Sequence, residues 1–207
     1  MIFVIKIKVM RRKLYSIVRS WIKTDFKPPQ YSLKYRNIKN CKLIPNRNLL
    51  LNKLPKEGIV AEVGVYKGSY SEKIWNTCRP SKLHLIDLFP DNTMDIVYDK
   101  FCRQINLGTI ELHASDSVET SFPDRYFDWI YIDTEHKYDR LIKELYHYAP
   151  TIRRGGFIAG HDFVIGNWNE FIKYGVIEAV NEFCVNNDWE LIYLTMETHS
   201  SFVIRKI

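Results

Sequence analysis

The sequence has few cysteines, and their spacing argues against two common structural roles. Its 207 residues include four cysteines, and no two of them form a Cys-x-x-Cys pair. Cysteines scattered in this way indicate neither a zinc site nor a framework of disulfide bonds. We therefore expect reduced thiols, as in a cytosol-like compartment. The four are Cys41, Cys78, Cys102 and Cys184.

The sequence also lacks a long apolar run near its start. Residues 1–9 alternate apolar and basic side chains, and this segment is too short and too charged to span a bilayer. A secretory signal peptide would place its charges before an apolar stretch and end in small residues, and that order is not seen here. We therefore expect a cytoplasmic protein.

Acidic residues are almost missing from the first quarter of the chain. Residues 1–50 hold thirteen Lys and Arg but a single acid, Asp25, whereas residues 51–207 hold seventeen Lys and Arg against twenty-three acids. The net charge of +6 thus comes from a basic N-terminal arm, for which we take residues 1–57. A basic arm is attracted to anionic surfaces. No nucleic-acid-binding module accompanies it, so we expect no specific nucleic-acid partner.

Within the arm, residues 10–23 have the apolar spacing of an amphipathic helix. Leu14, Ile17, Val18 and Trp21 share one helical face, and the basic residues lie elsewhere. Such a helix either lies on a membrane surface, which would make the protein membrane-associated, or docks onto the folded body or a second copy of the chain. We therefore expect peripheral membrane contact or a partner contact, a homo-oligomer included, through this segment.

Residues 58–207 predict one α/β domain. Strand-like apolar runs alternate with helical periodicity, which favours a mostly parallel sheet covered by helices on both faces. The last two runs are joined by a loop too short for a crossover, so they form an antiparallel pair. Helices are expected over 71–77, 94–105, 138–148 and 176–185, with a loop or short helix over 117–122. The seven expected strands are Ile59–Val63, Leu83–Asp87, Thr109–His113, Asp128–Asp133, Gly156–Gly160, Glu190–Met196 and Ser201–Ile207.

The first of these strands leads into a turn with two glycines. Glu62 is the only charged residue of the run Ile59–Val63, and Gly64 and Gly68 let the backbone bend and approach a ligand closely. A carboxylate at the carboxyl end of a parallel strand lies where ligands bind in open α/β folds. The spacing differs from the Gly-x-Gly-x-x-Gly of dinucleotide sites, so a ligand without a pyrophosphate is favoured. An ordinary turn into a helix capped by Ser69 is the alternative.

Two later strands deliver further acids to the same edge. Asp87 ends its strand where a carboxylate can accept two hydrogen bonds from a ribose diol; the alternative is a cap on the next helix. Asp116 follows the third strand and could accept a hydrogen bond from the exocyclic amine of a base, or close an Asx turn in its Ser-rich surroundings. Both are candidate contacts to a nucleoside.

The fourth and fifth strands end in a group of carboxylates and imidazoles. Asp133 and His136 follow one strand, and His161 and Asp162 follow the next. Adjacent parallel strands would bring all four to one edge of the sheet. Two carboxylates and two imidazoles converging on a cleft form a credible site for a hard cation and a general base. Any one of the four alone is more often a cap or a surface residue.

In their order, these motifs resemble the class I S-adenosylmethionine-dependent methyltransferases, and more narrowly the branch with macrocin-type sugar O-methyltransferases and cephalosporin-hydroxylase-like proteins. The resemblance covers residues 58–207 and implies a Rossmann-like, doubly wound, mostly parallel seven-stranded sheet with a C-terminal antiparallel strand pair. Its motifs are Glu62-Val-Gly-Val-Tyr-Lys-Gly68, Asp87, Ser115-Asp116-Ser117, Ile132-Asp-Thr-Glu-His-Lys-Tyr138 and Gly155-Gly-x-x-x-Gly-His-Asp162.

The resemblance implies how the cofactor, S-adenosylmethionine, would lie. Glu62, Gly64 and Gly68 would face its methionine portion. Asp87 would hold the ribose, and Asp116 would lie by the adenine.

The resemblance also implies that Asp133 and Asp162 bind a divalent cation, Mg²⁺ or another, that orients the acceptor hydroxyl. Members that use Mg²⁺ have two adjacent carboxylates after the fifth strand, and here His161 takes the first place. Imidazole is a poor ligand for Mg²⁺, so either water completes the coordination, another metal is used, or no metal is needed. Either His136 or His161 would serve as the base, and Asp133 would orient one of them or bind the metal.

Three functions remain open. The first is methyl transfer to a hydroxyl of a small-molecule or glycan acceptor, such as a sugar or glycoconjugate. The second is a non-catalytic protein that keeps the cofactor-binding fold and is tethered by its basic arm. The third, a Rossmann-like oxidoreductase, is disfavoured because the third close glycine is missing and because the closing antiparallel pair fits methyltransferases better.

Overall fold

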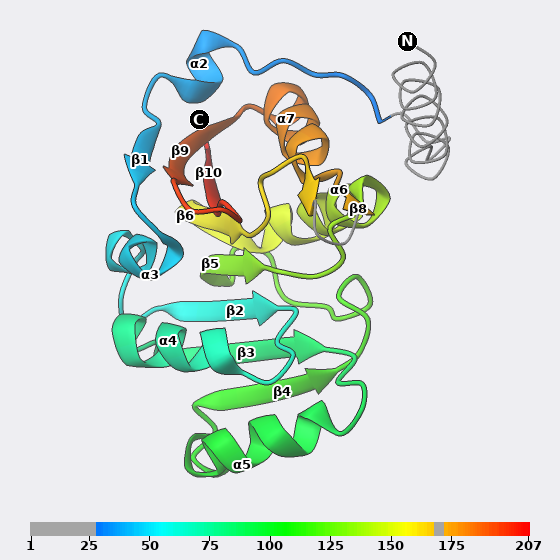
Figure 1. Ribbon diagram of the computed structural model, residues 1–207. Helices are drawn as coiled ribbons and strands as arrows, with labels where there is room; N and C mark the ends of the chain where they lie inside the picture. Colours follow the sequence, from blue (N-terminus) through cyan, green and yellow to red (C-terminus); the bar gives the residue numbers. More distant parts are fainter. Residues whose placement is uncertain (1–27, 168–171) are drawn as a thin grey trace, which may run out of the picture.

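A computed structural model of the chain describes residues 28–167 and 172–207 (Figure 1). The amphipathic segment predicted over residues 10–23 lies outside the described residues, so its membrane or partner contact stays a prediction. Across the described ranges, each helix is too short or too polar to cross a membrane.

The fold is built on an eight-stranded sheet with the order β1-β9-β10-β6-β5-β2-β3-β4. Neighbouring strands are parallel except where β10 is involved, because β10 runs antiparallel to both β6 and β9. A separate antiparallel pair joins β7 (Gly166–Asn167) to β8 (Ile172–Lys173). The strands of the main sheet are β1 (Lys42–Ile44), β2 (Ile59–Val63), β3 (Lys82–Asp87), β4 (Ile110–Ala114), β5 (Phe127–Ile132), β6 (Ile152–Gly160), β9 (Trp189–Thr195) and β10 (Phe202–Lys206).

The seven predicted strands are all present, and the apolar runs explain their places. In β2, which lies between β3 and β5, Val60, Ala61 and Val63 have no exposed surface. A strand buried on both faces needs apolar residues at consecutive positions, so the run without alternation belongs at the centre of the sheet. The predicted antiparallel pair at the end of the chain is also confirmed, as β9 and β10.

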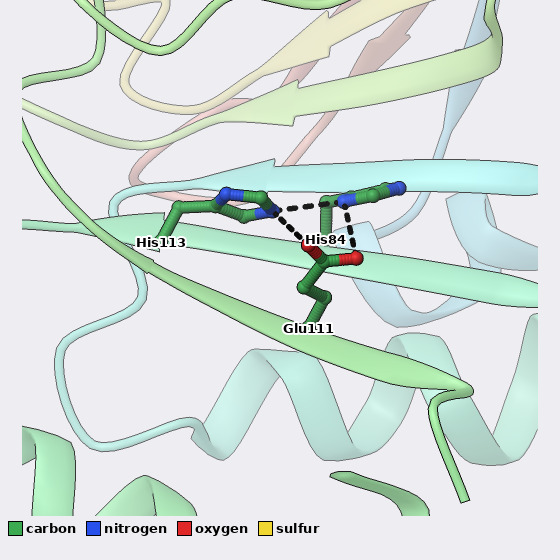
Figure 2. A group of neighbouring side chains, drawn as sticks. All are labelled: His84, Glu111 and His113. Atoms are coloured by element: carbon green, nitrogen blue, oxygen red, sulfur yellow. Dashed lines mark hydrogen bonds and ion pairs between the residues drawn. The ribbon is translucent and has the colours of Figure 1, made fainter.

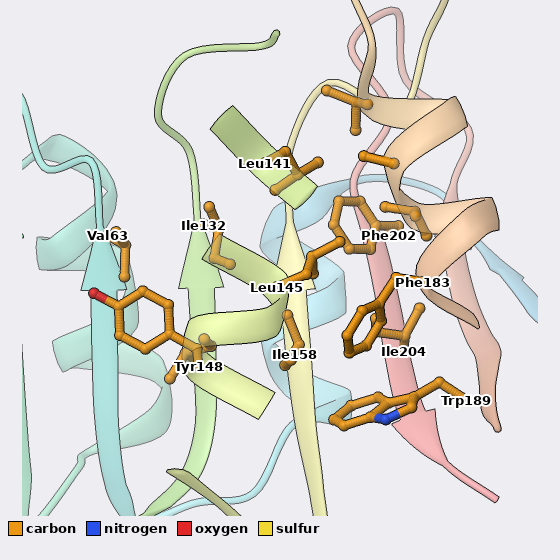
Figure 3. Packing of buried hydrophobic residues seen from close by; sticks show 14 of the residues in the cluster. Val63, Ile132, Leu141, Leu145, Tyr148, Ile158, Phe183, Trp189, Phe202 and Ile204 are labelled. Carbon is orange, nitrogen blue, oxygen red and sulfur yellow. The ribbon is translucent and has the colours of Figure 1, made fainter. Parts of the chain in front are cut away.

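Helices cover both faces, which confirms the doubly wound arrangement (Figure 1). On one face, α6 and α7 pack over the strands through a cluster that includes Leu145, Tyr148 and Phe183 (Figure 3). The other face carries α4, α5 and the short helices that precede β2. The described helices are α2 (Tyr35–Ile38), α3 (Arg47–Leu50), η1 (Leu51–Lys53), α4 (Ser69–Cys78), α5 (Thr93–Asn106), α6 (Tyr138–Tyr148), η2 (Ala149–Thr151) and α7 (Val176–Asn187).

One local prediction needs correction. The cap of α4 is Gly68, with a φ of 70°, and Ser69 is the first helical residue rather than the cap. Residues 117–122 form a turn followed by irregular loop, which is the first of the two forms that we expected there. The hydroxyl of Tyr148 donates to the backbone oxygen of Ser117 (2.6 Å), so α6 fixes this segment against the sheet.

The segment before β2 belongs to the folded body, which differs from the predicted boundary at residue 57. β1 pairs in parallel with β9 and adds the eighth strand to the seven that we expected. Leu50, Leu51 and Leu54 are buried against the face that carries α4 and α5. A strand of three residues in an Asn- and Lys-rich stretch is too short to show an alternating apolar pattern. Its conformation is stabilised by pairing with β9, which is far away in the sequence.

One asparagine fastens this segment to the body. The side chain of Asn37 is fully buried, and its Nδ2 donates to the backbone oxygens of Trp189 (2.7 Å) and Cys184 (3.2 Å). Its Oδ1 accepts from the backbone N–H of Lys34 (3.1 Å). These hydrogen bonds hold α2 against the junction between α7 and β9. A buried polar side chain, rather than an apolar contact, therefore attaches this segment to the body.

We predict that Asn37→Ala lowers the free energy of unfolding by about 1–3 kcal/mol, because it removes the buried hydrogen bonds to the backbone oxygens of Trp189 and Cys184. Urea unfolding followed by circular dichroism measures this. Asn52→Ala, at an exposed position of η1, is the control and should change little. An unchanged midpoint for Asn37→Ala would show that the segment is a detachable arm, as its composition first indicated.

Candidate active site

The carboxyl ends of the parallel strands meet at one edge of the sheet, and backbone hydrogen bonds join the residues just beyond them. The Gly64 N–H donates to the oxygen of Ile86 (2.9 Å), and the Asp133 N–H donates to that of Val63 (2.8 Å). The His161 N–H donates to the last residue of β5 (3.1 Å). The predicted site residues after β2, β5 and β6 therefore lie side by side.

Glu62 is buried at this edge and is 1% exposed. The hydroxyl of Ser71, on α4, donates a short hydrogen bond to its Oε2. Burial raises the pKa of Glu62 to about 8, and the carboxylate of Asp133 adds to the rise, while Ser71 and the guanidinium of Arg47 oppose it. A carboxyl group with so high a pKa exchanges its proton near neutral pH, which is a common property of functional sites.

A side chain is excluded at the two predicted glycines by different neighbours. Gly64 has a φ of 89°, and a Cβ there would lie 2.1 Å from the backbone oxygen of Asp133. Gly68 also has a positive φ, and a Cβ there would crowd Val97 and Phe101 of α5 at 3.3 Å. The turn after β2 thus packs closely against the end of β5 on one side and against α5 on the other.

Asp87 ends β3 beside this turn. Its Oδ2 accepts from the backbone N–H groups of Val65 (2.7 Å) and Tyr66 (2.9 Å), and its Oδ1 accepts from that of Phe89 (2.8 Å). A carboxylate has about four acceptor positions, so a ribose hydroxyl would share Asp87 with these amides. The carboxylate therefore shapes the glycine turn in addition to its predicted contact with a ligand.

Asp116 is engaged by the protein itself. Arg140 of α6 donates to both of its oxygens, at 3.0 Å and 2.9 Å, and the Val118 N–H donates to Oδ1 (3.0 Å) in the Asx turn that we had considered. Arg140 also donates to the fully buried Glu144 (3.0 Å), which accepts from Ser117 as well. The predicted contact to adenine stays a prediction, and the structure assigns Asp116 a role in fixing the loop after β4.

The four residues predicted after β5 and β6 do come together, and a fifth joins them. Asp162 Oδ2 lies 2.7 Å from His136 Nε2 and 3.0 Å from His161 Nδ1, and its Oδ1 lies 2.5 Å from His199 Nδ1. Asp133 Oδ1 lies 3.6 Å from His136 Nε2 and 3.7 Å from His161 Nδ1. Three imidazoles therefore surround one carboxylate that is 4% exposed.

In this cluster the negative carboxylates and the positive imidazole stabilise each other's charged forms. Burial opposes the charge on His136, but the carboxylates of Asp133 and Asp162 outweigh it and raise the pKa of His136 to about 9. Burial likewise opposes ionisation of Asp162, but His136 and His161 hold the pKa of Asp162 well below its usual range. At neutral pH His136 is thus protonated and Asp162 is ionised.

The cluster has three features of a ligand-binding centre. Asp162 has a φ of 58°, a conformation that is rare outside glycine and that concentrates at functional sites. His136 Nε2 lies close to Asp162, but it is not oriented to form a hydrogen bond with any described residue. One ligand atom each from Asp133, His136 and Asp162 lies within 4.8 Å of the other two, a spacing that fits a metal ion.

Two important side chains were missed from the sequence. His199 lies in the loop between β9 and β10; because β9 runs parallel to β6, that loop could have been placed at the same edge. Arg47 comes from the stretch read as a linker, where no signal marked it. Its NH1 lies 3.5 Å from Asp133 Oδ2, and its guanidinium lies 4.6 Å from the centre of the Tyr70 ring.

A cavity of about 510 Å³ opens beside the cluster. His199 forms part of its wall, together with residues of the β7 strand and α7. The lining residues are Val164, Ile165, Gly166, Asn167, Ile177, Thr198 and His199. A larger cavity, of about 580 Å³, lies at the opposite end of the strands between Arg125, Arg153 and Lys206, away from these groups.

Residues 61–163 match a family model described as a methyltransferase domain. No curated protein matches the sequence. Among solved structures, a SAM-dependent methyltransferase from Aquifex aeolicus has a TM-score of 0.60 at 12% identity, with 91% of this chain and 96% of that chain covered. A SAM-dependent O-methyltransferase from Thermotoga maritima has a TM-score of 0.56 at 10% identity, with 77% and 63% covered.

Other similar structures extend the comparison. The pyocyanin biosynthetic protein PhzM has a TM-score of 0.58 at 11% identity, with 77% of this chain covered, and this chain spans only 55% of its length. A Streptococcus mutans protein solved in complex with SAH has a TM-score of 0.55 at 14% identity, with 77% and 95% covered. These findings confirm the Rossmann-like fold, and the family model supports a methyltransferase domain over residues 61–163. They do not single out the macrocin-type branch or an acceptor.

We predict that Glu62→Gln flattens the pH dependence of stability. Between the unfolded pKa of about 4.3 and the folded value of about 8, the folded state keeps a proton that the unfolded state has lost. Wild-type stability therefore falls as pH rises through this range, by up to about 1.4 kcal/mol per pH unit. Urea unfolding from pH 5 to pH 8 measures the slope.

The control for this experiment is Glu57→Gln, which changes an exposed carboxylate and should keep the wild-type slope. A Glu62→Gln slope equal to that of the wild type would mean that Glu62 is ionised in the folded protein.

Proposed function

We propose that this chain, in which residues 61–163 form a methyltransferase domain, transfers a methyl group from S-adenosylmethionine to a hydroxyl of a small polar acceptor, a sugar or glycoconjugate. One observation carries the proposal. The glycine turn with the buried Glu62 and the imidazole-carboxylate cluster around Asp162 lie at the same edge of the sheet, joined by the backbone contact between Gly64 and Asp133.

The turn after β2 would hold the cofactor. When bound, S-adenosylmethionine supplies a methyl group already activated on a sulfonium. We assign Glu62, Gly64 and Gly68 to the methionine portion and Asp87 to the ribose, because these residues surround one bend of the chain. Asp116 would act on the adenine side by holding its loop in place with Arg140.

The cluster would prepare the acceptor. A sugar hydroxyl needs groups that accept its hydrogen bond and its proton, and carboxylates and neutral imidazoles do both. His136 is held protonated by two carboxylates, so it is a weak base at neutral pH. We therefore assign the base to His161, with Asp162 orienting its ring through Nδ1 at 3.0 Å. The cavity beside His199 gives the acceptor a place next to these groups.

A divalent cation fits this cluster as well. Asp133, His136 and Asp162 would hold it, and it would polarise the acceptor hydroxyl. Two carboxylates with an imidazole suit Mn²⁺, Fe²⁺ or Zn²⁺ better than Mg²⁺, which prefers oxygen ligands alone. With the cation bound, His136 would be a neutral ligand, so His161 remains the base in either case.

Calorimetric titration with S-adenosylhomocysteine, followed by transfer of labelled methyl groups to a panel of sugars and glycoconjugates, tests the proposal. The transfer is measured with and without added divalent cations. Binding followed by transfer to a hydroxyl supports the proposed enzyme. Binding without transfer to any acceptor would favour the non-catalytic alternative, and a failure to bind would contradict both.

We predict that Asp87→Ala weakens binding of S-adenosylhomocysteine by about 1–3 kcal/mol, as expected for the loss of charge-assisted hydrogen bonds. The dissociation constant is measured by calorimetry. Asp99→Ala removes an exposed acid from α5 and serves as the control with the same change of charge. Equal affinities for the two variants would remove Asp87 from the cofactor site.

We predict that His161→Gln slows methyl transfer by about 10²–10⁴-fold, the usual contribution of a positioned base, and leaves the affinity for S-adenosylhomocysteine within about twofold. His147→Gln is the control, because His147 on α6 contacts the Thr120 backbone oxygen and not the cluster. A transfer rate equal to that of the wild type would assign the base elsewhere.

A further inference from the structure

A second group of metal-ligating side chains lies on the face of the sheet, away from the edge where the strands end. Figure 2 shows His84 of β3 with Glu111 and His113 of β4. In the parallel register His84 lies opposite Glu111, and His113 is two residues farther along β4. Because side chains alternate between faces along a strand, all three project from the same face.

The three side chains are close enough to share one ion. His84 Nδ1 lies 2.9 Å from His113 Nε2, 3.9 Å separates it from Glu111 Oε2, and Glu111 Oε1 lies 4.0 Å from His113 Nε2. Two ligands of a tetrahedral zinc ion, each about 2.1 Å from the metal, lie about 3.4 Å apart. The observed separations fall on both sides of that value, so small side-chain movements would complete the site.

We propose that His84, Glu111 and His113 bind a transition-metal ion of the Zn²⁺ type, with His84 Nδ1, His113 Nε2 and a Glu111 oxygen as ligands. Two imidazoles and one carboxylate are a donor set that zinc uses in proteins, with water in the fourth position. The side chain of Glu111 is 48% exposed, which leaves that position open to solvent. The proposal does not depend on the proposed function.

The surroundings of His84 orient it as a ligand. Its Nε2 lies 3.1 Å from the Tyr126 hydroxyl. In the tautomer in which Nε2–H donates to this hydroxyl, the lone pair of Nδ1 is available to an ion between His113 and Glu111. A partner on the second ring nitrogen is the usual support of a histidine that binds a metal. The rings of Phe122 and Phe127 pack edge-on against the His84 ring, with ring centres 5.1 Å and 5.6 Å from its centre, and restrict its orientation.

Lys82 opposes metal binding and makes the proposal testable. Its Nζ lies 2.8 Å from Glu111 Oε2, so it competes for the carboxylate and places a positive charge beside the ion. It also donates to the Gly108 backbone oxygen (2.8 Å). Replacing Lys82 by an uncharged side chain should therefore strengthen metal binding, a gain that damage to the fold cannot produce.

The test is calorimetric titration of the chelator-treated full chain with Zn²⁺ alone, repeated with Co²⁺ and followed by visible absorption. The variants are His113→Gln, Glu111→Gln and Lys82→Met. Controls are His147→Gln, outside both clusters, and His136→Gln, which removes a ligand from the cluster around Asp162. Circular dichroism verifies the fold of each variant.

We expect His113→Gln and Glu111→Gln to lose one bound equivalent that the two controls retain, and Lys82→Met to bind that equivalent roughly tenfold more tightly, given the Coulomb energy of a nearby unit charge. Bound Zn²⁺ should also raise the melting temperature of the wild type by more than that of His113→Gln, which keeps only the cluster around Asp162. The proposal is overturned if the wild type binds no Zn²⁺, or if His136→Gln alone removes the binding.

Discussion

The contact between the backbone at Gly64 and the backbone at Asp133 is the constraint on which the proposed site depends. A single methyl group on Gly64 would come within 2.1 Å of the Asp133 oxygen, so the turn after β2 reaches the end of β5 only without a side chain. This contact brings the residues assigned to the methyl donor against those assigned to the acceptor. Group transfer needs the reacting atoms about 3–3.5 Å apart, and a wider spacing of the two strand ends would separate them.

Two carboxyl groups near this contact have opposite protonation states, and their neighbours explain the difference. Within residues 28–167 and 172–207, the Ser71 hydroxyl is the one direct donor to Glu62, so burial dominates and raises its pKa to about 8. Asp162 is buried too, but His136 and His161 lie against it and lower its pKa. When the surroundings shift the pKa values of two similar groups in opposite directions, the groups can take different roles in catalysis. Glu62 can gain or lose a proton near neutral pH, whereas Asp162 stays a fixed negative charge.

The sequence predicted the strands and most of the edge where they end, because buried strands and the polar residues that follow them leave a local signal. The meeting of Asp133, His136, His161 and Asp162 followed from strand order alone. Arg47 and β1 could not be found in this way, since their places depend on pairing with β9 and on the burial of Asn37 far along the chain. The partner of Asp116 was equally hidden, because Arg140 reaches it from the next helix.

The group formed by His84, Glu111 and His113 was hidden for a different reason. Each residue stands inside a strand, where a polar side chain reads as an ordinary solvent-facing position, and only the register of β3 against β4 shows that the three coincide. β4 is the outermost strand at one side of the sheet, so it pairs with β3 alone. An ion bound across β3 and β4 would hold this outer strand to β3, the strand that ends in Asp87. The ion proposed between β3 and β4 and the proposed reactive cluster at the strand ends are therefore compatible in one small domain.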